Sequence, residues 1–139
     1  MFEVRYAAES DWAFWHTLDS DLCEIEFMRK VRDRRVYLIC DDSQPVGVMR
    51  YNLLWDITPF LTLIYLGKHN RGKGFGRQAV LHWEAEMRGA GHRMVMTSTQ
   101  VNERAQHFYR KLGYIERGGV FLDGTPLNQP QEMFMLKVF

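Results

Sequence analysis

The stretch that decides the fold runs Tyr65-Leu-Gly-Lys-His-Asn-Arg-Gly-Lys-Gly-Phe-Gly-Arg77. An apolar, strand-like run leads into its closely spaced glycines, and a helix-like pattern follows at once. Glycine lets backbone N–H groups approach a ligand, and a helix start adds unpaired donors and the positive end of a dipole. Four cationic side chains lie within ten residues: Lys68, Arg71, Lys73 and Arg77. The stretch therefore predicts an anion site, with phosphate as its natural occupant.

Three phosphate-binding patterns compete for this stretch. The dinucleotide fingerprint G-x-G-x-x-G fails because Arg77 stands in the place of its third glycine. The P-loop of nucleotide hydrolases, G-x-x-x-x-G-K-[ST], fits until Gly74, which stands where the metal-binding hydroxyl belongs. The pattern R-x-x-G-x-G is satisfied by Arg71, Gly74 and Gly76. A tight strand-to-helix connection without a ligand would need only one glycine, so the three glycines and four cations make that interpretation the weaker one.

A second segment decides among these patterns. It reads Asn102-Glu-Arg-Ala-Gln-His-Phe-Tyr-Arg-Lys-Leu-Gly-Tyr114 and predicts a helix that Asn102 caps and that ends before Gly113. The two stretches give the succession strand, R-x-x-G-x-G, helix, strand, N-x-x-A-x-x-F-Y-x-K-L-G-[FY]. From Phe60 to Tyr114, this succession closely resembles the acetyl-CoA-binding core of the GNAT superfamily of N-acetyltransferases. Outside it, only the order of elements agrees.

The resemblance implies where the cosubstrate acetyl-CoA binds. Relatives hold the CoA pyrophosphate on the amides of the glycine turn. They hold the pantetheine arm like an added strand against the end of the preceding strand, where backbone groups are unpaired. Asn102 matches the asparagine that contacts this arm, a role that can coexist with capping the helix. The matching cofactor-binding positions are Ile64, Tyr65, Leu66, Arg71, Gly72, Lys73, Gly74, Phe75, Gly76, Arg77 and Asn102.

The resemblance also implies a catalytic tyrosine, Tyr109, seven residues after Asn102. In relatives this tyrosine protonates the departing CoA thiolate. A phenol is a weak acid, yet a positioned donor can stabilise the leaving sulfur. Without the resemblance, a half-buried aromatic residue beside Phe108 would be the simpler interpretation.

The general base is where the sequence departs from the family pattern. An alkylamine acceptor is mostly protonated at neutral pH and must lose a proton before it attacks a thioester. Many relatives place a carboxylate on one of the two central strands, whereas the corresponding positions here hold Thr62 and Thr97. The substitutes, acting directly or through water, are Asp56, Glu24 and Glu26. Asp56 is more simply explained as a turn residue, and no base is assigned from the sequence.

Periodicity predicts an α/β fold with the element order β-α-α-β-β-β-α-β-α-β-β. We expect one domain over residues 1–139, with a mixed, mostly antiparallel central sheet of about six or seven strands flanked by about four helices. The expected strands are Val4–Ala7, Val36–Cys40, a long one through Met49 and Trp55, Phe60–Leu66, Met94–Val101, Tyr114–Leu122 and Met133–Phe139. The expected helices are a short one that Ser10 caps, one from the cap Asp19-Ser20-Asp21 through about Arg34, one with Phe75, Ala79, Val80, Trp83 and Met87 on one face that stops at Gly89-Ala90-Gly91, and one that Asn102 caps.

Composition narrows the class of protein. Eighteen Lys and Arg against seventeen Asp and Glu give a net charge of +1, which provides no overall attraction to nucleic acid. No apolar run is long enough to cross a bilayer as a helix, and the first residues do not resemble a signal peptide. Cys23 and Cys40 lie among apolar residues, which predicts buried, reduced thiols and no metal pattern. We therefore expect a cytoplasmic protein without a metal, nucleic-acid or membrane partner, and leave a homodimer open.

The functional hypothesis is an acyltransferase that moves acetyl from acetyl-CoA to a primary amine by direct attack, without a covalent enzyme intermediate. The alternative from another class is a non-catalytic acyl-CoA-binding or sensor module, which would keep the glycine turn but lack a base. No motif identifies the acceptor, so aminoglycosides, polyamines, free amino acids and protein amines all stay open.

Overall fold

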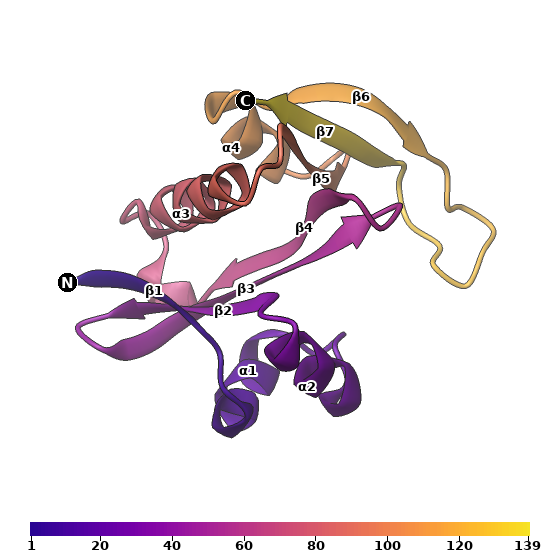
Figure 1. The fold of residues 1–139 in the computed structure, drawn as a ribbon. Helices are drawn as coiled ribbons and strands as arrows, with labels where there is room; N and C mark the ends of the chain where they lie inside the picture. Colours follow the sequence, from indigo (N-terminus) through magenta and orange to yellow (C-terminus); the bar gives the residue numbers. More distant parts are fainter. The chain divides into compact units, whose positions relative to one another are not determined.

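The computed structural model describes all residues from Met1 to Phe139 (Figure 1). Its strands are β1 (Phe2–Tyr6), β2 (Val36–Asp41), β3 (Gln44–Leu54), β4 (Thr58–Leu66), β5 (Met94–Gln100), β6 (Ile115–Val120) and β7 (Glu132–Val138). Its α-helices are α1 (Trp12–Leu18), α2 (Glu24–Arg32), α3 (Phe75–Gly89) and α4 (Ala105–Lys111), and two short 3-10 helices are η1 (Glu9–Asp11) and η2 (Lys68–Asn70). The predicted order of elements is confirmed.

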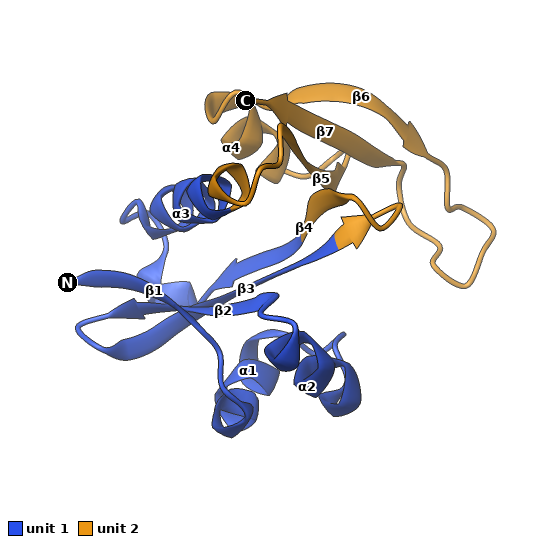
Figure 2. Ribbon diagram, in the orientation of Figure 1, with its two compact units in different colours: residues 1–52, 62–86 blue, residues 53–61, 87–139 orange.

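The seven strands form one mixed sheet in the order β1-β2-β3-β4-β5-β7-β6. β4 and β5 are parallel, whereas β1–β2, β2–β3, β5–β7 and β6–β7 are antiparallel pairs. The expected class, a mixed and mostly antiparallel sheet with four helices, is therefore confirmed. The chain divides into two compact units, one of residues 1–52 and 62–86 and one of residues 53–61 and 87–139 (Figure 2).

In the first unit, β2 is buried on both faces, as its unbroken apolar run predicts. One face joins α1 and α2 in a core cluster that includes Trp15, Phe27, Val36, Leu38 and Cys40. Successive strand residues point to opposite faces, so Tyr37 lies on the other side. There it stacks on Tyr51 and meets the edge of His82, which belongs to α3.

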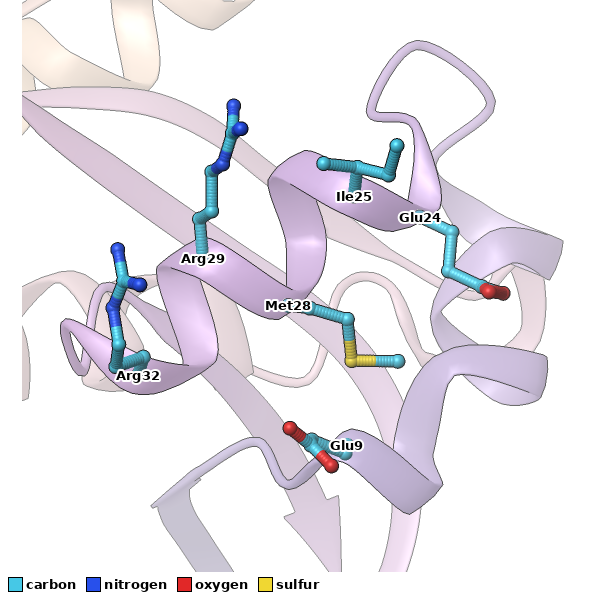
Figure 3. A pocket seen from close by; sticks show the side chains of 6 residues that line it. All are labelled: Glu9, Glu24, Ile25, Met28, Arg29 and Arg32. Carbon is cyan, nitrogen blue, oxygen red and sulfur yellow. The ribbon is translucent and has the colours of Figure 1, made fainter.

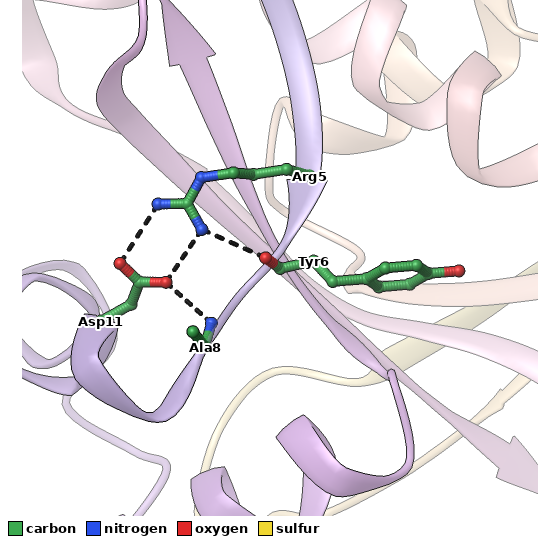
Figure 4. Close-up of polar contacts among 4 residues, drawn as sticks. All are labelled: Arg5, Tyr6, Ala8 and Asp11. Atoms are coloured by element: carbon green, nitrogen blue, oxygen red, sulfur yellow. Dashed lines mark hydrogen bonds and ion pairs between the residues drawn. The ribbon is translucent and has the colours of Figure 1, made fainter.

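Ser10 does not cap α1, contrary to the prediction. The carboxylate of Asp11 makes the side-chain hydrogen bonds in the turn before α1 instead. Asp11 accepts the backbone N–H of Ala8 at 2.7 Å, and its two oxygens accept hydrogen bonds from Arg5 at 2.9 and 3.2 Å (Figure 4). The guanidinium of Arg5 favours the charged carboxylate and lowers the pKa of Asp11 below its usual value. Because Arg5 lies on β1, this contact ties β1 to the turn before α1.

The segment Asp19-Ser20-Asp21 does not cap α2, contrary to the prediction. The helix begins later, and Cys23 at its N-cap position makes no side-chain cap. Cys23 is also exposed, so the prediction of two buried cysteines holds only for Cys40. Asp19 is buried instead, where it accepts hydrogen bonds from Trp15 Nε1 at 3.0 Å and Arg50 Nε at 2.8 Å. Both of these donors bind Oδ2, one from α1 and one from β3, while Oδ1 accepts the N–H of Asp21 at 3.2 Å, so the carboxylate closes a local turn and an ion pair with β3 rather than capping α2.

Replacing Asp19 by alanine is expected to lower the free energy of unfolding by about 3–5 kcal/mol, because Arg50 is left as an uncompensated, nearly buried charge. Urea unfolding would measure the loss. Asp33→Ala is the matched control, since Asp33 forms a solvent-exposed pair with Arg32 at 3.5 Å and should cost less than about 1 kcal/mol. Equal losses for the two variants would contradict the central role of the Asp19–Arg50 pair.

Candidate active site

The end of β4 is fitted closely against β3 within the first unit. Gly67 donates its backbone N–H to the carbonyl of Val46 at 2.8 Å. A Cβ at Gly47 would lie 2.5 Å from Cδ2 of Leu66 and 3.0 Å from the carbonyl oxygen of Tyr65, so a larger residue there would displace the Leu66 side chain and press on the backbone of β4. The strand end therefore has little freedom on its β3 side, and Tyr65 is left exposed.

Arg71 folds back over this strand end. Its Nε donates a hydrogen bond to the carbonyl of Leu66 at 3.1 Å, and its guanidinium carbon lies 4.9 Å from the centre of the Tyr65 ring. A guanidinium over an aromatic face at this distance is a favourable cation–π contact. The structure thus brings together three positions predicted to bind the cofactor, Tyr65, Leu66 and Arg71.

The glycine turn has backbone angles that favour glycine. Gly72 has φ +76° and Gly74 has φ +82°, both in the left-handed region that other residues rarely adopt. A Cβ built on either glycine would meet no atom within 4 Å. The conformation, and not crowding inside the protein, is therefore what requires glycine at these two positions.

The turn leads directly into the start of α3. The N–H of Gln78 donates to the carbonyl of Gly74 at 3.1 Å, which is a hydrogen bond of the first helical turn. The amides of Phe75, Gly76 and Arg77 precede that bond and have no partner inside the helix. The Phe75 ring packs against Phe2 of β1, with the ring centres 5.6 Å apart, so its side chain anchors the turn.

The cations around this turn are all solvent-exposed: Lys68, Arg71, Lys73 and Arg77. With the positive end of the α3 dipole they make the turn electrostatically suited to a multiply charged phosphate group. This geometry agrees with the anion site that the sequence predicts.

Tyr109 lies in the second unit, buried on α4. Its ring meets Phe108 and Tyr114 edge-on, with ring centres 5.1 and 5.4 Å away. Burial raises the pKa of Tyr109 to about 12, against a smaller lowering by a hydrogen bond with the side chain of Thr97. The phenol is therefore fully protonated at neutral pH and available as a hydrogen-bond donor.

Asn102 does not cap α4, which corrects the sequence prediction. It is exposed in a turn, the helix begins at Ala105, and Arg104 occupies the N-cap position without a side-chain bond. The side chain of Gln106 reaches back instead, and donates to the carbonyls of Val101 at 2.7 Å and Glu103 at 3.1 Å. Capping therefore does not occupy the side-chain amide of Asn102, and its contact with the cofactor stays a prediction.

The three candidate bases lie in different settings. Glu26 forms an ion pair with Arg29 on α2, and Asp56 is exposed in the turn between β3 and β4 with φ +64°. Glu24 lines an open pocket of about 430 Å³, into which Met28 of α2 extends toward Glu9 of η1 (Figure 3). The pocket is lined by Glu9, Glu24, Ile25, Met28, Arg29 and Arg32. None of these settings distinguishes one carboxylate as the base.

The sequence marks Thr97 only as a position at which many relatives have a carboxylate. The threonine is buried on β5, and its hydroxyl donates to the carbonyl of Leu61 at 2.9 Å. Thr97 and Thr99 are two residues apart on β5 and therefore share one face of the sheet, and both are buried, which the run Thr97-Ser-Thr99 of polar residues does not indicate.

Comparison with protein families decides the identity. The model of the acetyltransferase (GNAT) family matches residues 2–114. The chain belongs to the GNAT family of acetyltransferases. It is accordingly an acetyl-CoA-dependent acyltransferase, with acetyl-CoA as its cosubstrate. This conclusion confirms the resemblance noted in the sequence and goes against the alternative of a non-catalytic module.

Solved structures show the same GNAT fold at low sequence identity. Ard1 from Thermoplasma volcanium has a TM-score of 0.85 at 12% identity, covering 99% of this chain and 97% of that one. Ribosomal-protein-alanine N-acetyltransferase from Brucella melitensis has a TM-score of 0.80 at 19% identity, covering 99% of each chain. Spermidine/spermine N-acetyltransferase from Vibrio cholerae has a TM-score of 0.78 at 16% identity, covering 99% and 92%.

No curated protein sequence matches the chain significantly. The solved structures that share the fold include acetyltransferases named for quite different acceptors, a ribosomal protein in one case and polyamines in another. None of the helices has the length and apolar character needed to cross a membrane.

Proposed function

We propose that this GNAT protein acetylates a primary amine by direct attack of the amine on acetyl-CoA. The observation that carries the proposal is the turn before α3, where Gly72 and Gly74 hold left-handed angles among exposed cations. Such a turn exposes consecutive amides to an anion without side chains in the way. It is suited to the pyrophosphate of CoA.

The cosubstrate has a second element to bind, the end of β4. We propose that the pantetheine arm lies along Ile64, Tyr65 and Leu66, exchanging hydrogen bonds with the backbone as an added strand would. Arg71 already contacts both Tyr65 and Leu66. We propose that the guanidinium of Arg71 also binds the pyrophosphate, which lies next to the arm. Asn102 is proposed as a further contact to the arm.

Tyr109 is the proposed donor to the departing sulfur. Its pKa of about 12 exceeds the ~8.5 of an ordinary thiol. Complete transfer of the phenol proton to the sulfur is therefore uphill. The useful interaction is a hydrogen bond that strengthens as negative charge develops on sulfur during cleavage of the carbon–sulfur bond. Solvent then completes the protonation of the released thiolate.

The amine must reach the thioester with a free electron pair. Loss of its proton to Asp56, Glu24, Glu26 or water satisfies this need, and the proton balance is the same in each case. Thr62 and Thr97 carry no carboxylate and cannot act as the base, and Thr97 is buried.

We further propose a cytoplasmic location, which the free cysteines Cys23 and Cys40 favour. A homodimer is kept as an alternative to a monomer.

A panel of amines tests the proposal. Aminoglycosides, polyamines, free amino acids and peptides with free N-termini would each be incubated with acetyl-CoA, and thiol release compared with acetylated product by mass spectrometry. We expect equal amounts of thiol and N-acetylated product for one amine class. Direct attack also predicts no exchange of labelled CoA into acetyl-CoA when amine is left out. Such exchange would indicate an acyl-enzyme and contradict the proposed mechanism.

A further inference from the structure

The backbone carbonyl of Leu66 points away from β3. The next residue, Gly67, donates its N–H to Val46 of β3 at 2.8 Å. All peptide bonds of the chain are trans, and a trans peptide directs the C=O of one residue and the N–H of the next to opposite sides. The pairing of β4 with β5 ends at Leu61. The Leu66 carbonyl therefore lies on the free side of β4, where the proposed pantetheine arm would need a hydrogen-bond acceptor.

The side chain of Arg71 already fills this place. Its Nε donates to the Leu66 carbonyl at 3.1 Å, close to the ~2.9–3.0 Å at which the amide of a paired strand donates. The guanidinium carbon lies 4.9 Å from the centre of the Tyr65 ring, so the planar group rests on that side chain as well. An incoming arm and the Arg71 side chain therefore compete for one carbonyl.

The contacts that hold Arg71 at the strand end are of modest strength. One is a hydrogen bond to an uncharged carbonyl, and the other is a ring contact at an exposed site. A pyrophosphate at the glycine turn, which begins at the next residue, would offer the guanidinium a charged and bidentate partner. Such hydrogen bonds are about twice as strong as neutral ones. A pyrophosphate can therefore draw Arg71 off the strand end, whereas a ligand without phosphate cannot.

We propose that Arg71 is a specificity-determining residue, which covers the Leu66 carbonyl until a pyrophosphate at the glycine turn draws its guanidinium away. The inference rests on the proposed binding of CoA along β4 and at the turn. It adds a reason for the site to select thioesters that carry a pyrophosphate. A phosphate-free thioester meets a covered strand end, and its affinity is reduced to the fraction of molecules in which the carbonyl is uncovered.

The experiment divides the cosubstrate into two probes. S-acetylpantetheine has the arm and the thioester but no phosphate, and inorganic pyrophosphate supplies the anion; ligand-observed NMR measures their weak binding. In the wild-type protein, saturating pyrophosphate should tighten S-acetylpantetheine binding about 3- to 10-fold, as expected for one neutral hydrogen bond, because Arg71 couples the two sites. Unchanged or weaker binding of S-acetylpantetheine would overturn the inference.

Arg71→Ala leaves the Leu66 carbonyl uncovered and should shift the two thioesters in opposite directions. S-acetylpantetheine should bind about 3- to 10-fold more tightly than to wild type, and pyrophosphate should no longer improve its binding. Acetyl-CoA should bind at least about 10-fold more weakly, because its pyrophosphate loses a charge-assisted hydrogen bond. A variant with a disturbed strand end would lose affinity for both thioesters, and that result would overturn the inference.

Lys73→Ala is the matched control. Lys73 is an exposed cation of the same turn but, unlike Arg71, makes no hydrogen bond or ring contact with β4. Its loss should weaken acetyl-CoA binding, leave the affinity for S-acetylpantetheine within about twofold of wild type, and preserve the effect of saturating pyrophosphate. A gain in S-acetylpantetheine affinity equal to that of Arg71→Ala would assign the effect to net charge and overturn the role of Arg71.

The failure of this inference can be told apart from failure of the proposed function. If Arg71 does not cover the carbonyl, wild-type protein still binds acetyl-CoA, and only the responses of S-acetylpantetheine to pyrophosphate and to Arg71→Ala are missing. Absence of acetyl-CoA binding in the wild-type protein would refute the proposed function and this inference together.

Discussion

Valine in place of Gly74 is expected to abolish acetyl-CoA binding, with Kd raised at least about 100-fold, or roughly 2.7 kcal/mol. Gly74 has φ +82°, which a β-branched residue adopts only under strain. Relief of that strain would rearrange the turn and withdraw the amides at the start of α3, and the valine methyls would stand over those that remain. Isothermal titration calorimetry with acetyl-CoA measures the loss directly.

The variant should stay folded, because an added Cβ at Gly74 meets no atom within 4 Å. Gly124→Val is the matched control, since Gly124 has φ +75° and equally free surroundings but lies between β6 and β7. We expect the control to bind acetyl-CoA as wild type does, with a similar loss of thermal stability. Normal affinity in Gly74→Val would mean that the pyrophosphate is held elsewhere.

Phenylalanine in place of Tyr109 is expected to lower kcat about 10²- to 10⁴-fold, the usual contribution of a positioned proton donor. The ring and its edge-on contacts with Phe108 and Tyr114 are kept, and only the hydroxyl is lost. The lost interaction forms as charge develops on sulfur, so the KM for acetyl-CoA should change little. Steady-state kinetics at saturating amine, with calorimetry for acetyl-CoA affinity, provides the measurement.

The pH dependence gives a second check on Tyr109. Because burial raises its pKa to about 12, the phenol keeps its proton up to about pH 11, and wild-type kcat should not fall between pH 9 and 11 through loss of this donor. Tyr6→Phe, which removes an exposed phenol bonded to Glu86, should leave kcat unchanged. A Tyr109→Phe variant with normal turnover would reduce Tyr109 to a packing residue.

The glycine turn could be predicted because its requirements are local. Gly72 and Gly74 stand where the backbone turns left-handed between a strand and a helix, and only glycine adopts such angles without strain. The succession of elements followed from hydrophobic periodicity for the same reason. The helix after the turn runs from Phe75 to Gly89 and stops at the glycines that the sequence predicts as its end, since that stop signal is local.

Two predictions of helix caps failed, and a distant partner explains the first of them. Asp19 looked like a helix cap, yet Arg50, 31 residues away in sequence, takes its carboxylate into the core. Asn102 is predicted as the cap of α4, but the helix begins only at Ala105, and Arg104 occupies the N-cap position. A cap is worth about 1 kcal/mol, which is less than the cost of leaving a buried guanidinium unpaired.

The fold class, the glycine turn and the proposal of Tyr109 as the donor all follow from the sequence alone, because each depends on backbone angles or spacings within short segments. Only the tertiary structure decided the environment of Tyr109. Its burial depends on α4 packing against β5, and the Thr97 hydroxyl that acts on it is anchored to Leu61, 36 residues earlier in the chain. The acidity of a buried phenol is set by desolvation and by the donors around it, and no spacing along the sequence encodes which distant hydroxyl is brought to that place.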